Sequence, residues 1–122
     1  MQEINSQDWR EFCERVNRQC QGAMISIEFV EPDGLKTEIA SDLTLEGMVF
    51  DTQDPCNDVI LVRMRNGREI TYDIIEPIHI RLRGSEGRND FNPVQIEAEN
   101  GIIFLTLHPA IHAQMLEGLK IN

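Results

Sequence analysis

Five side chains of this chain could together bind an anion, and they fall on two predicted strands. The first strand carries Arg63 and Arg65, and the second carries His79, Arg81 and Arg83. Because alternate residues of a strand point to the same face, the members of each set share a face. If the two faces adjoin, they form an anion-binding patch. If they do not, the arginines are a solvated face paired with acids such as Glu69.

His108 and His112 are four residues apart, a spacing that suits two metal ligands on one face of a helix. His108 precedes Pro109, however, and a residue before proline disfavours helical backbone. No nearby acid or HExxH motif completes a ligand set, so a capping or surface role is the favoured interpretation. We expect no metal site here, and nothing in the sequence indicates a cofactor.

The segment from Asp51 to Asp58 is predicted as a loop and contains Cys56. A nucleophilic cysteine needs a base or cation that favours the thiolate, whereas Asp54 and Asp58 disfavour it. Cys56 is therefore interpreted as a tolerated loop residue. The carboxylates of Asp51, Asp54 and Asp58 could bind calcium weakly, although their spacing is not that of an EF-hand loop. Calcium binding by this segment stays open.

Composition narrows the class of protein. With 122 residues, 41% hydrophobic and 26% charged, the chain is predicted to fold as one globular domain. A net charge of −10, concentrated in the first half, argues against a nucleic-acid or anionic-membrane partner. Three cysteines, no signal-peptide pattern and no long apolar run predict a cytoplasmic protein.

A helix is predicted after Ser6, which is the expected N-cap, and Gly22 can end it. Its apolar residues recur every three or four positions and form one stripe: Trp9, Phe12, Cys13, Val16 and Cys20. The two cysteines of this stripe are expected to be buried thiols, because their separation along a helix, roughly 10 Å, is too long for a disulfide.

The rest of the chain alternates with a period of two and predicts strands. The turn Glu31-Pro-Asp-Gly34 closes a hairpin in which Glu31 pairs with Leu35, and in which Ile39 shares the face of Ile27. Gly47 is a candidate bulge or close approach in the next strand. The polar segment 84–93 is predicted as a loop. Pro109 is expected to open a C-terminal helix with Ile111, Met115 and Leu119 on one face.

Two Asn-Gly dipeptides are expected to make different turns. At Asn66-Gly67, a three-residue loop pairs Met64 with Arg68 and places Arg63 opposite Glu69. At Asn100-Gly101, a two-residue type I′ turn pairs Glu99 with Ile102 and has positive φ at both turn residues. In each case the chosen register gathers the apolar residues on one face.

These elements predict an α+β, mostly β fold. It is an antiparallel meander of about seven strands, curled into a small barrel or half-barrel, with an N-terminal helix and a short C-terminal helix. Four features carry a resemblance: Trp9 and Phe12 in the helix, Gly22-Ala23, Ile74–Ile78, and the hairpin from Ile96 to Gly101. Through them the chain resembles a family of small bacterial domains of unknown function. The resemblance implies a bacterial cytosolic protein and assigns no catalytic residue.

The sequence is compatible with two classes of function. The favoured hypothesis is a non-enzymatic interaction module that binds an unidentified protein or itself, as a homodimer, through a sheet edge or the C-terminal helix. The alternative is a small-molecule or anion-binding domain, or an enzyme, with its site at the barrel mouth near His79, Arg81 and Arg83. A pocket with convergent polar groups would favour this alternative.

Overall fold

A computed structural model describes residues 2–54, 57–84 and 90–121. Its elements, in chain order, are β1 (Gln2–Ile4), the 3-10 turn η1 (Ser6–Asp8), α1 (Trp9–Gln19), β2 (Met24–Val30), β3 (Lys36–Asp54), β4 (Asn57–Arg65), β5 (Glu69–Ile75), β6 (Pro77–Gly84), β7 (Asp90–Ala98), β8 (Gly101–His108), β9 (Ile111–His112) and the 3-10 turn η2 (Ala113–Leu116).

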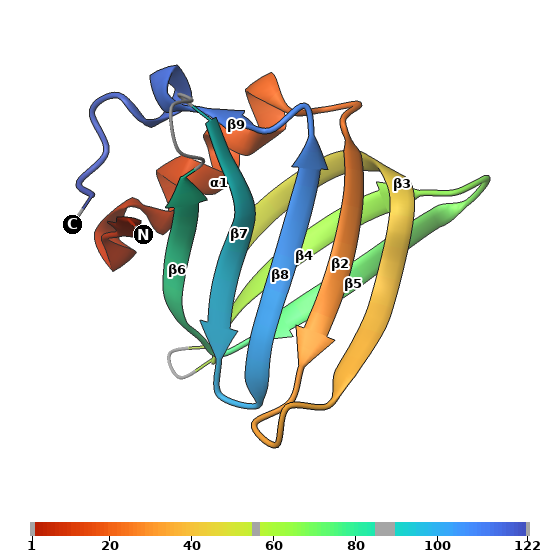
Figure 1. Ribbon diagram of the computed structural model, residues 1–122. Helices are drawn as coiled ribbons and strands as arrows, with labels where there is room; N and C mark the ends of the chain where they lie inside the picture. Colours follow the sequence, from red (N-terminus) through yellow and green to blue (C-terminus); the bar gives the residue numbers. More distant parts are fainter. Residues whose placement is uncertain (1, 55–56, 85–89, 122) are drawn as a thin grey trace.

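The strands form one antiparallel sheet in the order β1-β6-β7-β8-β2-β3-β4-β5, with β9 paired to β7. The sheet curls without closing, so that β4 and β5 pass behind β8 and β2 (Figure 1). The predicted α+β half-barrel is confirmed. The additional strands are the two short ones, β1 and β9, which are too brief to show an alternating pattern in the sequence.

β3 is the strand that joins the front and back layers. Its first half pairs with β2 and its second half with β4, and Thr44 pairs with Met24 on one side and Arg65 on the other. Irregular pairing on both sides of this point bends the strand. Asp42 has a φ of 51°, and its backbone N–H donates to Ser26 Oγ across 3.0 Å. Glu46 is bulged between Leu45 and Gly47, as predicted for this glycine.

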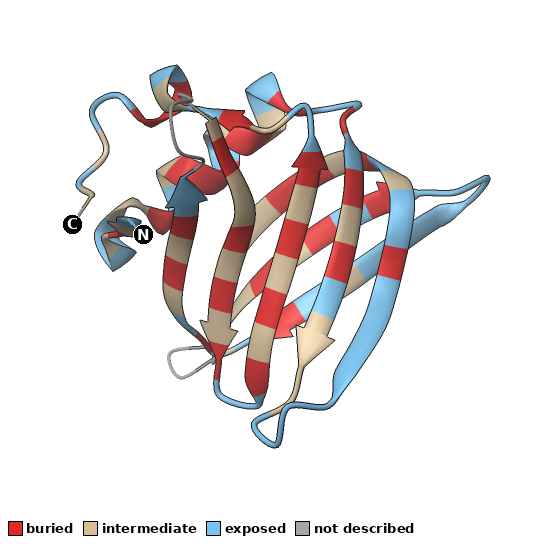
Figure 2. Ribbon diagram, in the orientation of Figure 1, coloured by how far each residue is buried: buried red, intermediate tan, exposed pale blue. Residues whose placement is uncertain are grey.

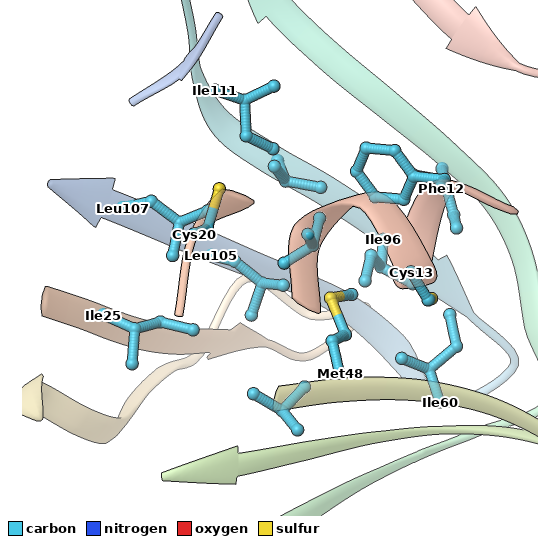
Figure 3. Packing of buried hydrophobic residues seen from close by; sticks show 14 of the residues in the cluster. Phe12, Cys13, Cys20, Ile25, Met48, Ile60, Ile96, Leu105, Leu107 and Ile111 are labelled. Atoms are coloured by element: carbon cyan, nitrogen blue, oxygen red, sulfur yellow. The ribbon is translucent and has the colours of Figure 1, made fainter. Parts of the chain in front are cut away.

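α1 packs its apolar stripe into the curve of the sheet. All five predicted stripe residues are buried, which confirms the helix and its orientation. Phe12 and Cys13 point among side chains of the sheet that include Ile60, Ile96 and Met48 (Figure 3). Asn17 fixes the helix to β3, because its Oδ1 accepts from the Met48 N–H beside Gly47. A Cβ on Gly47 would lie 3.0 Å from this oxygen, so the glycine permits the close approach.

The alternation of the strands decides which side chains form the core. Along β8 the buried residues alternate with half-buried ones (Figure 2), and the buried positions are Gly101, Ile103, Leu105 and Leu107. They face the buried residues Val94, Ile96 and Ala98 of β7. The predicted apolar face of this hairpin is therefore confirmed.

The structure corrects several predicted boundaries. Asn5, not Ser6, caps the first turn, since its side chain accepts from the Gln7 N–H. The segment predicted as a loop between residues 51 and 58 is mostly strand on both sides; residues 55 and 56 lie outside the described residues. β7 already begins at Asp90 within the predicted loop 84–93. At the other end of the chain, Ile111 is in a strand, and the expected helix is a single 3-10 turn.

The hairpin after β2 has the predicted turn. The Glu31 N–H donates to the Leu35 carbonyl oxygen, and Val30 pairs with Lys36. Further along, a register shift pairs Ile27 with Ala40. The expected position of Ile39 on the face of Ile27 is therefore wrong: Ala40 is buried, while Ile39 is 38% exposed.

Both Asn-Gly hairpins keep the predicted faces but differ in register. In the first, Arg65 pairs with Glu69 and Arg63 with Thr71, so the expected pairing of Arg63 with Glu69 is wrong. In the second, Ala98 pairs with Gly101, in place of the expected pairing of Glu99 with Ile102. Asn100 does not have the positive φ predicted for it, whereas Gly101 has a φ of 155°.

Candidate functional site

Two of the five candidate anion ligands lie in one charged cluster on the outer face of β6. His79 Nδ1 lies 2.7 Å from Glu3 Oε2, and Arg81 lies within 3.3 Å of Glu3 and 3.0 Å of Glu97. The hydrogen bond from His79, together with the charges of His79 and Arg81, holds the pKa of Glu3 below its usual range. Arg81 is thus engaged by two carboxylates, and the cluster fastens β1 to β6 and β7.

Arg63 and Arg65 lie on the outer face of β4. Arg65 forms an ion pair with Glu46 on the neighbouring strand. Arg63 lines a shallow depression of about 320 Å³ whose other lining residues include Asn17, Glu46 and Glu69. The acids beside these arginines supply negative charge where an anionic ligand would have to bind.

Arg83, two residues after Arg81 on β6, lines a groove of about 670 Å³ on the outer face of the front layer. The groove has Phe104 and Pro93 in its lining and the acids Glu28 and Glu38 on the side of β2 and β3. It is open to solvent, and its charged residues are of both signs. Within the sheet, β6 and β4 are separated by β7, β8, β2 and β3. The arginines of the two strands pair with different acids and line different depressions, so they do not form the one anion-binding patch considered above.

The inside of the half-barrel is filled by side chains. Between α1 and the sheet, a void of only about 10 Å³ is lined by apolar residues such as Phe12, Leu45 and Leu105. One water molecule needs at least that much space together with polar partners. This interior space is too small and too apolar for a metabolite.

The other chemically active residues are also placed apart. His108 ends β8 and His112 lies on β9, so they do not share a helix face. Asp51 and Asp58 belong to paired strands, opposite Val59 and Thr52. Within residues 2–54, 57–84 and 90–121, no group of three or more His, Cys, Asp or Glu side chains could hold a metal ion. Nor does any helix in these ranges have the length and apolar character to cross a bilayer.

The free edge of β5 offers a different kind of site. β4 and β5 pair in one unbroken register, from Val59 opposite Ile75 to Arg65 opposite Glu69. The Glu76 N–H donates to Asp58 O, and the Asn66 N–H to Arg68 O, at positions that continue this register. Because hydrogen-bonded pairs alternate along an antiparallel ladder, the even-numbered residues of β5 bond to β4.

The odd-numbered residues of β5 therefore turn their backbone N–H and C=O groups away from β4. They are Glu69, Thr71, Asp73 and Ile75, and all four are exposed. β5 ends the strand order of the sheet, so no strand among the described residues covers these groups. An open edge of this kind is a template for another strand.

The opposite edge of the sheet is protected. β1 has only three residues, and Ile4 forms a bridge with Ile121 on its outer side. The Asn5 N–H also donates to the Lys120 carbonyl oxygen across 2.9 Å. The hairpin that contains β5 was predicted, but the place of β5 at the edge of the sheet was not. Strand order depends on pairing between distant residues, for which the sequence carries no local signal.

These features define the class: a small α+β protein with a curled antiparallel sheet around one helix and an open strand edge. The chain belongs to the family of unknown function DUF5335, whose model matches residues 1–109. The expected membership in a family without an assigned function is thereby confirmed. Comparison with curated proteins and with solved structures gives no match to this chain.

Proposed function

We propose that this protein is a non-enzymatic interaction module that takes up a polypeptide strand at the free edge of β5. The observation that carries the proposal is the row of outward backbone groups at Glu69, Thr71, Asp73 and Ile75. An added strand would satisfy these groups with main-chain hydrogen bonds and gain specificity from alternate side chains. A cytoplasmic location in a bacterial cell fits the buried free thiols of Cys13 and Cys20.

The alternative, an anion or metabolite site near the arginines, has weaker support. Arg65 and Arg81 already face carboxylates, and the two arginine faces lie at different places in the sheet. Nucleic acid is also an unsuitable partner, because a chain with a net charge of −10 offers little clustered positive charge to the phosphates.

A proline at position 71 tests the proposal. The Thr71 N–H points away from β4, so Thr71→Pro removes an outward donor and places its ring at the edge without breaking the ladder. Thr71→Ala keeps the donor and is the matched control. Each tagged variant is used to capture proteins from a lysate of the source organism, its own untagged chain included.

We expect one or more proteins that Thr71→Ala retains and Thr71→Pro loses. Both variants should give the same far-UV circular dichroism spectrum, which establishes that the fold is intact. If the proline variant retains every protein that the alanine variant retains, the edge of β5 is not the binding site and the proposal is wrong.

A further inference from the structure

We infer that the strand added to β5 is β5 of a second copy of this chain. The two strands pair antiparallel, with Tyr72 of one copy opposite Tyr72 of the other. This pairing names the partner for the function proposed above and rests on that function. In this register Glu69 lies opposite Ile75 of the second copy, and Thr71 opposite its Asp73. The outward N–H and C=O groups of both strands then face each other as hydrogen-bonded pairs. The β3–β4–β5 layers of two copies join into one continuous sheet.

Charge selects this register from its neighbours. A two-residue shift in one direction places Asp73 opposite Glu69 of the other copy. A two-residue shift in the other direction places Asp73 opposite Asp73 of the other copy. Like charges directly opposite each other destabilise a strand pair. Centring on Tyr72 avoids both of these pairings.

The side chains of β5 are complementary in the same register. On the inner face, Tyr72 lies opposite Tyr72 of the second copy, and Ile70 lies opposite its Ile74. An aromatic side chain therefore pairs with an aromatic one, and an aliphatic side chain with an aliphatic one. Ile70 is 39% exposed and Ile75 58% exposed in the single chain, and both belong to the six large hydrophobic residues that the described surface exposes. The second copy would cover them.

Net charge does not oppose the contact locally. The whole chain is strongly acidic, but residues 63–76 carry three arginines and three acids. The hairpin of β4 and β5 is thus electrically balanced, and two copies can approach there without repulsion between like surfaces.

A cysteine scan measures the register. Opposite residues that are not hydrogen-bonded across the ladder have Cα atoms about 4.5 Å apart, within the range of a disulfide. In a Cys56→Ser background, Tyr72→Cys should form a disulfide-linked dimer under mild oxidation. Thr71→Cys and Asp73→Cys should not, because residues two steps out of register are about 7–8 Å apart. Cross-linking through position 71 or 73 instead of 72 overturns the inferred register.

Charge substitutions at position 71 give a test without cysteine. Thr71→Lys would face Asp73 of the other copy twice in each dimer, whereas Thr71→Glu would add two repulsive pairs. We expect the dimer dissociation constant, from sedimentation equilibrium, to fall about two- to thirtyfold in the lysine variant and to rise by a similar factor in the glutamate variant. Equal weakening by both substitutions would overturn the register.

The failure of this inference is distinguishable from that of the proposed function. A wild-type chain that stays monomeric at every concentration overturns self-association. If it nonetheless captures another protein in a way that Thr71→Pro abolishes, the edge-binding function stands. If the wild type dimerises and Thr71→Pro dimerises equally well, the contact lies elsewhere, and the inference is overturned.

Discussion

The indole Nε1–H of Trp9 donates a hydrogen bond to the carbonyl oxygen of Ile4 across 3.1 Å, which connects the start of α1 to the end of β1. The same indole ring meets Phe50 of β3 edge-to-face at a centroid distance of 5.8 Å. One side chain therefore contacts both the edge strand and the strand shared by the two layers.

Trp9→Ala should lower the free energy of unfolding by about 3–5 kcal/mol, because the side chain is buried and its removal leaves a cavity. Trp9→Phe keeps most of the packing and loses the hydrogen bond to Ile4, so its loss should be smaller. Urea unfolding followed by circular dichroism measures both values. Gln19→Ala, at an exposed position of the same helix, is the control. If the urea midpoint of Trp9→Ala equals that of the wild type, this indole does not contribute to the core.

Glu3 should contribute to stability in a pH-dependent way. Its pKa is lowered in the folded protein, chiefly by the hydrogen bond from His79, so its ionised form stabilises the fold above its ordinary pKa of 4.5. That contribution is lost as the pH falls through the lower pKa of the folded state. In Glu3→Gln, unfolding free energy should therefore depend less steeply on pH below about 4.5. Glu99→Gln serves as the exposed control, and equal slopes for Glu3→Gln and wild type would contradict the assignment.

Cys13 should be unreactive in the native protein. Burial raises the pKa of its thiol to about 12, and burial raises that of Cys20 as well. Only the thiolate reacts readily with disulfide reagents, so a Cys56→Ser variant should not react with Ellman's reagent at pH 8 until urea unfolds it. Two thiols should then appear together. Rapid reaction of either thiol under native conditions would show that α1 opens locally.

Gly101 should tolerate no side chain. Its φ is 155°, and a Cβ there would lie 2.5 Å from the Val30 carbonyl oxygen and 2.7 Å from the Phe29 ring. Gly34 also has a positive φ but open space around it, so Gly34→Ala tests backbone strain alone. We expect Gly101→Ala to lose about 1–3 kcal/mol more than Gly34→Ala, because overpacking adds to the strain. Equal thermal melting temperatures for the two variants would argue against this contact.

The sequence pattern predicted the faces of strands better than their registers. In both Asn-Gly hairpins the pairing differs from the prediction by two residues: Arg65 meets Glu69 in one, and Ala98 meets Gly101 in the other. A shift by two leaves each side chain on the same face, so burial of apolar residues does not distinguish the two registers. Only the turn geometry does, and there Asn100 did not adopt the expected positive φ.

The candidate site was harder to predict for a related reason. The spacing of Arg81 and His79 correctly placed them on one outer face, but their acidic partner Glu3 comes from a three-residue strand with no pattern of its own. The edge position of β5 follows from which strands pair across the whole chain. Neither the partner nor the edge is encoded near the residues concerned.

The continuity of β3 has a consequence for how the molecule opens. Its two halves carry the ladders of both layers, and Thr44 belongs to both ladders. If β2 separates from the first half, the bend held by Asp42 and Ser26 is lost, and with it the alignment of the second half on β4. The two layers are therefore one cooperative unit, and their slowest-exchanging amides should share a single opening free energy.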